Sequence, residues 1–179
     1  MNIVEVHVNG LILEHKNQQN IVILREAKGE RILPIWIGPN EAQAIRRILS
    51  DESFPRPLTH DLLQLVVEGL KARIARVVIA DLRENTYFAS VFVERESEVL
   101  SIDARPSDAI AVALRGKAPI FVNEELLQPP PQAEEQPGAE GETAAGEEAP
   151  RELTEEEKAE RLRRYLEKLN PEDFGKFQL

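Results

Sequence analysis

The sequence predicts an α+β fold, in which a mixed or antiparallel, hairpin-rich sheet is combined with three main helices. Two observations carry this prediction. The β-type runs come in neighbouring pairs joined by short polar turns, and the helical segments stand between such pairs rather than after every strand. A doubly wound parallel sheet would instead alternate one strand with one helix.

Strands are predicted from runs rich in β-branched and aromatic residues. The first run has the period-2 pattern of a half-buried strand, with Val4, Val6 and Val8 on one face. Pro34 within a later run indicates an edge strand or a bulge, because proline cannot donate a ladder hydrogen bond. The runs are residues 3–8 (resuming at 11–13), 21–24, 31–37, 73–82, 86–95, 99–102 and 120–122.

Three helices are predicted between these strands. Pro39 suits the first turn of a helix over residues 41–49. Thr59 and Ser107 are the expected N-caps of the second and third helices, which run to about Leu70 and Arg115. The third helix is apolar all round, which indicates burial on most sides. The second helix is expected to bury the face made of Leu62, Leu63, Val66, Val67 and Leu70.

The chain after residue 128 has a different composition. Residues 129–150 hold five Pro, six Glu and five Ala, and no aliphatic residue larger than alanine. Such a segment cannot bury enough apolar surface to offset its ordering entropy. We therefore predict a compact domain at 1–128, a disordered acidic linker at 129–153, and an amphipathic C-terminal helix with its tail at 154–179. The apolar stripe of that helix, Leu162, Tyr165, Leu166 and Leu169, is expected to dock on the domain, a second subunit or a partner.

Composition narrows the classes of function. The chain has no cysteine, so it holds no disulfide, thiolate nucleophile or zinc–thiolate site. No apolar run approaches the roughly 18 residues of a membrane span, and no signal-peptide pattern opens the chain. A cytoplasmic protein without membrane contact is expected. Of the net charge of −10, residues 1–128 carry −3, which leaves room for a local basic patch but does not predict the basic face usual in nucleic-acid-binding proteins.

Residues suited to chemistry gather at the junctions of the predicted elements, not in a strong motif such as a P-loop or a His-Glu-x-x-His. Asp103 ends a strand and Asp108 starts a helix, so a tight turn could bring both carboxylates to one Mg²⁺. His60 is a candidate general base, or acid toward the leaving oxygen. Arg105 is a candidate phosphate ligand, and the backbone N–H groups at Ser107 would attract an anion.

The same residues also have structural interpretations, which stay open at this stage. Ser107 as an N-cap and Asp108 in the first turn would simply stabilise the helix start. Thr59 and Asp61 fit the same account for the second helix. A histidine in the position of His60 is more often a packed residue of the first helical turn than a catalyst.

Three segments resemble the bifunctional nuclease family in order and spacing. They are 33–38 followed by Glu41-Ala42, 56–63, and 103–111. The resemblance covers about residues 1–128, and the tail around 165–174 resembles C-terminal extensions of some bacterial members. It implies degradation of both DNA and RNA, and hence nucleic acid as a partner.

The leading hypothesis is a nuclease of broad specificity that depends on Mg²⁺ or another divalent metal and needs no organic cofactor. The competing hypothesis is a non-catalytic regulatory module that forms a homodimer and recruits a protein partner through its C-terminal helix. The acidic charge favours the second hypothesis, and the family resemblance favours the first. The candidate residues are His60, Asp61, Asp103 and Asp108 for catalysis, Asp103 and Asp108 for the metal, and Arg105, Ser107 and Arg56 for substrate binding.

Overall fold

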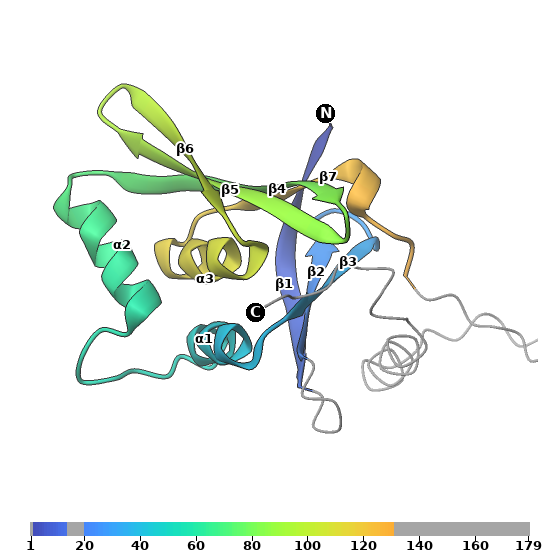
Figure 1. Ribbon diagram of the computed structural model, residues 1–179, viewed down its shortest axis with the longest axis horizontal. Coiled ribbons are helices and arrows are strands. Elements are labelled where there is room, and N and C mark those ends of the chain that lie inside the picture. The colour runs from blue at the N-terminus through green and yellow to red at the C-terminus, as the bar shows by residue number, and fades with distance from the viewer. Residues whose placement is uncertain (1, 14–19, 131–179) are drawn as a thin grey trace, which may run out of the picture.

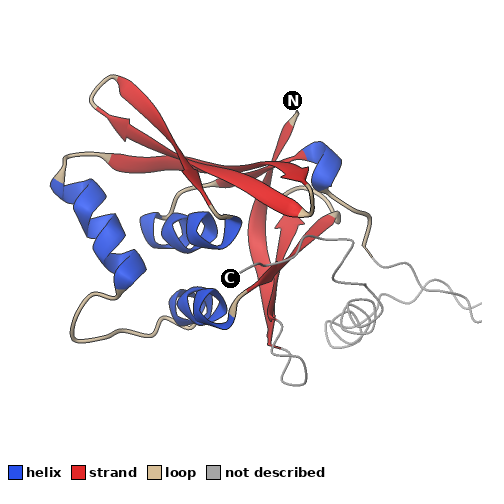
Figure 2. Cartoon of the chain, viewed as in Figure 1, coloured by secondary structure: helices blue, strands red, loops and turns tan. Residues whose placement is uncertain are grey.

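The computed structural model describes residues 2–13 and 20–130 and confirms the predicted α+β fold. Within this part of the chain, seven strands form one mixed sheet, and three α-helices lie on one of its faces (Figures 1 and 2). The helices found there are all too short or too polar to cross a membrane. The predicted linker at 129–153, except its first two residues, and the predicted C-terminal helix at 154–179 lie outside the described residues.

Two antiparallel meanders of three strands, joined by one short strand, make up the sheet. The strands are β1 (Ile3–Leu13), β2 (Asn20–Glu26), β3 (Ile32–Ile37), β4 (Arg73–Arg83), β5 (Thr86–Arg95), β6 (Glu98–Ala104) and β7 (Ile120–Asn123). Their order in the sheet is β3-β2-β1-β7-β4-β5-β6. The short strand β7 joins the meanders because it pairs antiparallel with β1 and parallel with β4.

The sheet curls around the helices. Bulges between Val8 and Gly10 in β1, and after Ile74 and Ile79 in β4, increase the local twist. In Figure 1 the β1–β3 meander runs steeply across the β4–β6 meander. The two edge strands therefore lead to the same inner face: β3 continues into α1 (Pro39–Leu49) and β6 into α3 (Pro106–Gly116). The edge position of β3 agrees with the expectation from Pro34.

Helix α3 is the centre of the fold. It packs against α1, α2 (Thr59–Gly69), β4 and β5. Residues 109–113 are at most 2% exposed, which confirms the predicted burial on most sides. The main core lies between α3 and the inner face of the sheet, where Val77, Ile79 and Val122 are fully buried. A second, smaller cluster on the other face of β2 and β3 contains Ile21, Ile23, Ile32 and Trp36.

The prediction that α2 buries its apolar face is wrong for every residue of that face except Val67, which is partly buried and packs against the main core. Of the eleven residues of α2, all within the described part of the chain, none is buried. The polar side of the helix turns inward instead, because His60 and Asp61 bond side chains of α3. The apolar residues are therefore 48–59% exposed: Leu62, Leu63, Leu65, Val66 and Leu70.

The predicted N-caps of α2 and α3 are also displaced. Leu58 and Arg105 are the N-cap residues, so Thr59 is the first residue of α2 and Ser107 the second residue of α3. Pro106 takes the first helical position, where its missing N–H costs nothing. Asp61 and Asp108 consequently stand at the third position, where a carboxylate faces the positive end of the helix dipole.

Lys117 ends α3 in the left-handed conformation, with φ 50° and ψ 35°. The next N–H, of Ala118, donates to the carbonyl of Ala113 at 2.9 Å, which is the hydrogen bond of a Schellman turn. We predict that Lys117→Gly raises the free energy of unfolding by about 0.5–1 kcal/mol, because glycine adopts this conformation without steric cost. Urea denaturation measures the change. Lys117→Ala keeps the strained Cβ and should show no such gain; equal gains in both variants would contradict the explanation.

Candidate active site

Four side chains at the N-terminal turns of the three α-helices form one polar network, which we call the tetrad: His60, Asp108, Arg105 and Glu41. Arg105 Nε donates to Asp108 Oδ2 at 2.7 Å, and its Nη2 lies 3.0 Å from Glu41 Oε1. His60 Nε2 is 3.0 Å from Asp108 Oδ1. The tetrad therefore joins α1, α2 and α3, and Asp108 holds a partner on each of its two oxygens.

The tetrad lies at the surface. The Arg105 side chain is 53% exposed, whereas the side chains of His60 and Glu41 are 17% and 14% exposed. A solute can therefore reach the guanidinium of Arg105, while His60 is held in a more sheltered position against α3. A cation open to solvent beside a sheltered imidazole is an arrangement that can contact an anion and move a proton at adjacent points.

The charge of Asp108 is stabilised by its neighbours. The hydrogen bond from His60 lowers the pKa of Asp108 most, partial burial opposes this, and Arg105 lowers the pKa further, to about 2. Asp108 is thus ionised at neutral pH and accepts hydrogen bonds at both oxygens. The contact with Arg105 raises the pKa of the guanidinium in turn.

The ionised Asp108 decides the tautomer of His60. A carboxylate only accepts hydrogen bonds, so Nε2 of His60 must carry the hydrogen between them. In the neutral imidazole, Nδ1 is then the basic nitrogen, and it has no hydrogen-bond partner among the described residues. A histidine held by a carboxylate in this way can take up a proton at its other nitrogen, which is the property of a general base.

A second polar connection lies beside the tetrad and involves Arg115, a residue of α3 whose side chain is 7% exposed. Arg115 Nε donates to Asp61 of α2, Nη1 donates to the carbonyl of Ala111 at 2.9 Å, and Nη2 donates to the carbonyl of Ala44 in α1 at 3.3 Å. We call this connection the Arg115 clamp. It links the same three helices as the tetrad.

Asp61 belongs to the clamp. Burial acts to raise the pKa of Asp61, but the hydrogen bond from Arg115, and then that from the N–H of Leu58 (2.9 Å), outweigh burial and lower the pKa. Both oxygens of Asp61 are therefore engaged, one by the clamp and one by the start of its own helix. The structure places Asp61 next to His60 in the chain but in a different set of bonds.

Asp103 does not join the tetrad. It lies on β6 directly opposite Ser90, and the preceding Ile102 lies opposite Val91. Opposite residues point to the same face of a sheet and successive residues to opposite faces. Because Val91 belongs to the main core, Asp103 points to the outer face, away from the helices. It is exposed and has no hydrogen-bond or ion-pair partner among residues 2–13 and 20–130.

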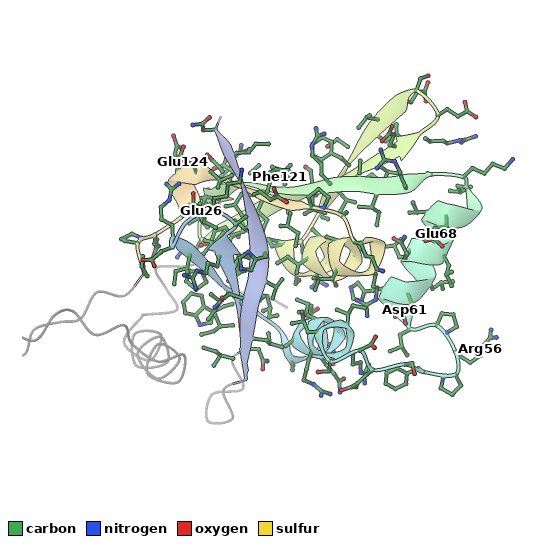
Figure 3. The ribbon with its side chains drawn as sticks, turned by 180° about the vertical axis from the view of Figure 1, so that it is seen from behind. Glu26, Arg56, Asp61, Glu68, Phe121 and Glu124 are labelled. Atoms are coloured by element: carbon green, nitrogen blue, oxygen red, sulfur yellow. The ribbon has the colours of Figure 1, made fainter. Side chains whose placement is uncertain are left out.

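The two remaining predicted residues are also apart from the tetrad's side chains. Ser107 is only 4% exposed, so its side chain faces the protein interior. Arg56 is an exposed residue of the loop between α1 and α2. Figure 3 shows Arg56 at the outside of this loop and Asp61 at the start of α2. Ser107 can thus act only through its backbone, and Arg56 only on a ligand that extends across the loop.

The described residues do not form a ready metal site. Nowhere in the described part of the chain do three His, Asp or Glu side chains lie close enough together to hold one ion. Asp108 already has a partner on each oxygen, and Asp103 points to the other face of the sheet. The turn between Asp103 and Asp108 thus does not bring the two carboxylates together as the sequence suggested.

Two residues of these networks had no role assigned from the sequence. Glu41 follows Gly38-Pro39-Asn40 and stands at the third position of α1, as Asp108 does in α3, and this parallel was the available signal. Arg115 is the one basic residue of α3 and follows the apolar run 109–114. A charge in such a setting indicates a buried partner, but the sequence does not say which one.

The comparison with protein families gives one match. The family described as the bifunctional nuclease domain matches residues 22–134. This range contains all the residues of the tetrad and the clamp.

Individual relatives agree with that match. An uncharacterized protein of Mycobacterium tuberculosis is 38% identical over 170 residues, which cover 95% of this chain and 97% of that protein. Bifunctional nuclease 1 of Oryza sativa subsp. japonica is 28% identical over 109 residues, or 59% of this chain and 33% of that protein. Bifunctional nuclease 1 of Arabidopsis thaliana is 28% identical over 127 residues, or 68% and 39%. The chain spans 33% and 39% of the length of these two plant proteins.

The low pKa of Asp108 predicts a specific loss of stability in acid. Because this pKa lies below the value of about 3.9 in an unfolded chain, ionised Asp108 stabilises the fold above that value. The contribution, about 2 kcal/mol, is lost as the pH falls from about 4 toward 2. Urea unfolding between pH 6 and pH 2 should show this loss, and Asp108→Asn should remove that part of the pH dependence. A variant with the same acid profile as the wild type would contradict the assignment.

The clamp predicts that Asp61→Asn destabilises the fold by about 2 kcal/mol, because it leaves the buried guanidinium of Arg115 without a charged partner. Asp81→Asn is the matched control. Asp81 also accepts a bond from a backbone N–H (Leu82) and from an arginine (Arg83, 2.6 Å), but this arginine is 70% exposed. We expect the control to cost much less, because solvent screens an ion pair between exposed groups. If urea denaturation shows that both variants lose the same free energy of unfolding, the buried Arg115 clamp is no more stabilising than an exposed ion pair.

Proposed function

The chain belongs to the bifunctional nuclease domain family, and from this premise we propose that it hydrolyses phosphodiester bonds of both DNA and RNA at the tetrad. The observation that carries this proposal is the carboxylate of Asp108, which holds His60 on one oxygen and Arg105 on the other. A candidate general base and a candidate phosphate ligand thus stand at fixed places about one carboxylate.

In the proposed reaction, Nδ1 of His60 takes a proton from the water that attacks phosphorus. Asp108 keeps the imidazole oriented and stabilises the imidazolium that forms, as the carboxylate does in other carboxylate–histidine pairs. The bond from phosphorus to the leaving oxygen breaks on the side opposite the attacking water, that oxygen takes up a proton from solvent, and the imidazolium releases its proton to solvent. Arg105 donates to a non-bridging oxygen and offsets the charge that develops there.

Glu41 competes with the substrate in this scheme. Its carboxylate occupies Nη2 of Arg105, the group that a phosphate oxygen would also bind. Binding of substrate therefore replaces a carboxylate by a phosphate at the same guanidinium. Backbone N–H groups near Ser107 would support the same anion, and Arg56 would contact a more distant phosphate of the strand. Asp61 acts as a positioning residue, because it holds α2 and with it His60.

A requirement for Mg²⁺ or another divalent ion is part of the proposal in a limited form. Mg²⁺ is often held by one or two carboxylates together with substrate phosphates, rather than by a complete protein cage. Since no group of three ligands exists among the described residues, an ion would have to arrive with the substrate. Of the two carboxylates that the sequence offered for the ion, Asp108 belongs to the tetrad, whereas Asp103 points to the other face of the sheet and would not reach it. No step above depends on the ion.

The second candidate function is a non-catalytic, dimeric regulatory module in the cytoplasm. The exposed apolar face of α2 favours association with another protein surface. A homodimer is compatible with both candidates, whereas recruitment of a protein partner through residues 154–169 belongs to the second. Purified full-length chain incubated with labelled DNA and RNA, with and without EDTA, separates the two. Cleavage of both substrates supports the nuclease, loss with EDTA supports the metal, and intact substrates under all conditions support the module.

We predict that His60→Ala and Asp108→Asn each lower kcat by about 10²- to 10⁴-fold, because each removes the oriented general base. Asp103→Asn is the matched control, since it changes an exposed carboxylate of the same β6–α3 junction that points to the other face of the sheet. It should leave kcat within a factor of about two, well short of an acid–base effect. Steady-state cleavage rates for DNA and RNA give the values. If Asp103→Asn is inactive and Asp108→Asn active, the site lies on the outer face and the tetrad is structural.

A further inference from the structure

Helix α2 has the wrong side turned to water for a monomeric protein. Its outward stripe contains Leu62, Leu65, Val66 and Leu70 and no charged residue, and each of these side chains is about half exposed. An amphipathic helix on a monomer usually buries such a stripe and exposes its polar side. Contiguous exposed apolar surface of this kind marks an interaction site.

The helix cannot relieve this exposure by turning about its axis. His60 is bonded to Asp108, and Asp61 is bonded to Arg115, so both first-turn side chains tie α2 to α3. A half turn of the helix would break these contacts and leave the buried guanidinium of Arg115 without its charged partner. The stripe is therefore held outward by the same bonds that place His60.

The neighbouring edge of the sheet shows the same property. Leu100 and Ile102 of β6 lie opposite Val93 and Val91, so they point to the inner face, where the helices pack. Both are nevertheless about half exposed. As an edge strand, β6 also presents backbone N–H and C=O groups that no strand pairs within the described sheet. Figures 1 and 3 show α2 and the β5–β6 turn at the same end of the molecule.

The C-terminal segment of the same chain leaves from the other edge. Gln128, near the end of the described residues, pairs with Ile32 of β3. The edge strands β3 and β6 stand at opposite ends of the strand order, with the other five strands between them. The chain's own tail thus starts far from the stripe on α2, and a helix from that tail would leave the polar edge of β6 unpaired.

We propose that a second copy of this chain covers the α2–β6 face, defined as Leu62, Leu63, Leu65 and Val66 of α2, its C-cap Leu70, and Leu100 and Ile102 of β6. An uncharged face can meet its own copy about a two-fold axis without repulsion. Seven large apolar residues suffice for the core of a standard interface of 20–30 residues a side. This proposal rests on the homodimer of the proposed function and names the surface that forms it. In such a dimer the second copy would hold α2 against α3 and so keep His60 in position.

The test is the mass of the full-length chain in solution, by sedimentation equilibrium over a wide concentration range. We expect twice 20.2 kDa for the wild type, and 20.2 kDa for the double variant Leu62→Glu/Val66→Glu. Leu49→Glu is the matched control, because Leu49 of α1 is exposed to a similar degree but lies outside the face; it should remain a dimer. Circular dichroism checks that all three chains are folded.

A second measurement does not depend on disrupting the face. Since the chain has no cysteine, single Cys substitutions at positions 62, 65 and 66 can form disulfides only between copies. Oxidation should link at least one of these variants into a covalent dimer at low concentration, and Leu49→Cys should stay largely unlinked.

A wild type of 20.2 kDa at all concentrations, or equal linkage at Leu49, would overturn the proposal. In a monomer, slow hydrogen exchange along α2 would assign the face to residues 154–169 instead. None of these readouts requires nuclease activity, so this proposal and the proposed function can fail separately.

Discussion

The placement of the helices depends on the guanidinium of Arg115. Its planar fork donates to three helices at once: a carboxylate of α2, a carbonyl of α1 and a carbonyl of its own helix α3. Lysine could not serve all three, because a single ammonium cannot match these separate directions. Since α2 contributes no fully buried side chain among its eleven residues, and Val67 is its partly buried contact with the main core, polar bonds hold the rest of the helix in place. The clamp and the His60–Asp108 contact are those bonds.

This way of holding α2 connects the candidate site with the proposed interface. The polar side of α2 must face α3, because His60 must reach Asp108. The apolar side is then necessarily outward, where only another protein surface can remove it from water. One helix orientation therefore produces both a sheltered imidazole and an exposed apolar stripe. A protein that buried the stripe in its own core would lose the tetrad.

The tetrad also reflects the layout of the sheet. Each meander ends in an edge strand that leads into a helix with proline at its first position and an acid at its third, Glu41 in α1 and Asp108 in α3. The curl of the sheet brings these two helix starts together, and Arg105 bonds both acids. The residue stretches that resemble the nuclease family, and the match to residues 22–134, include these junctions. The resemblance is thus concentrated where the fold places its polar side chains.

The sequence by itself determined the elements of this protein, and the tertiary structure decided how they face one another. Period-2 runs, short polar turns between them and Pro39 at a helix start are local signals, because backbone sterics and hydrogen bonding act over a few residues. His60, Arg105 and Asp108 were likewise recognisable as polar residues at helix starts. The side of α2 that faces inward could not be recognised from the sequence, because the apolar stripe predicted that this stripe would be buried. The opposite orientation results from bonds to Arg115 and Asp108, which are distant in the sequence. The separation of Asp103 from Asp108 depends on strand register, in which a shift of one residue exchanges the two faces.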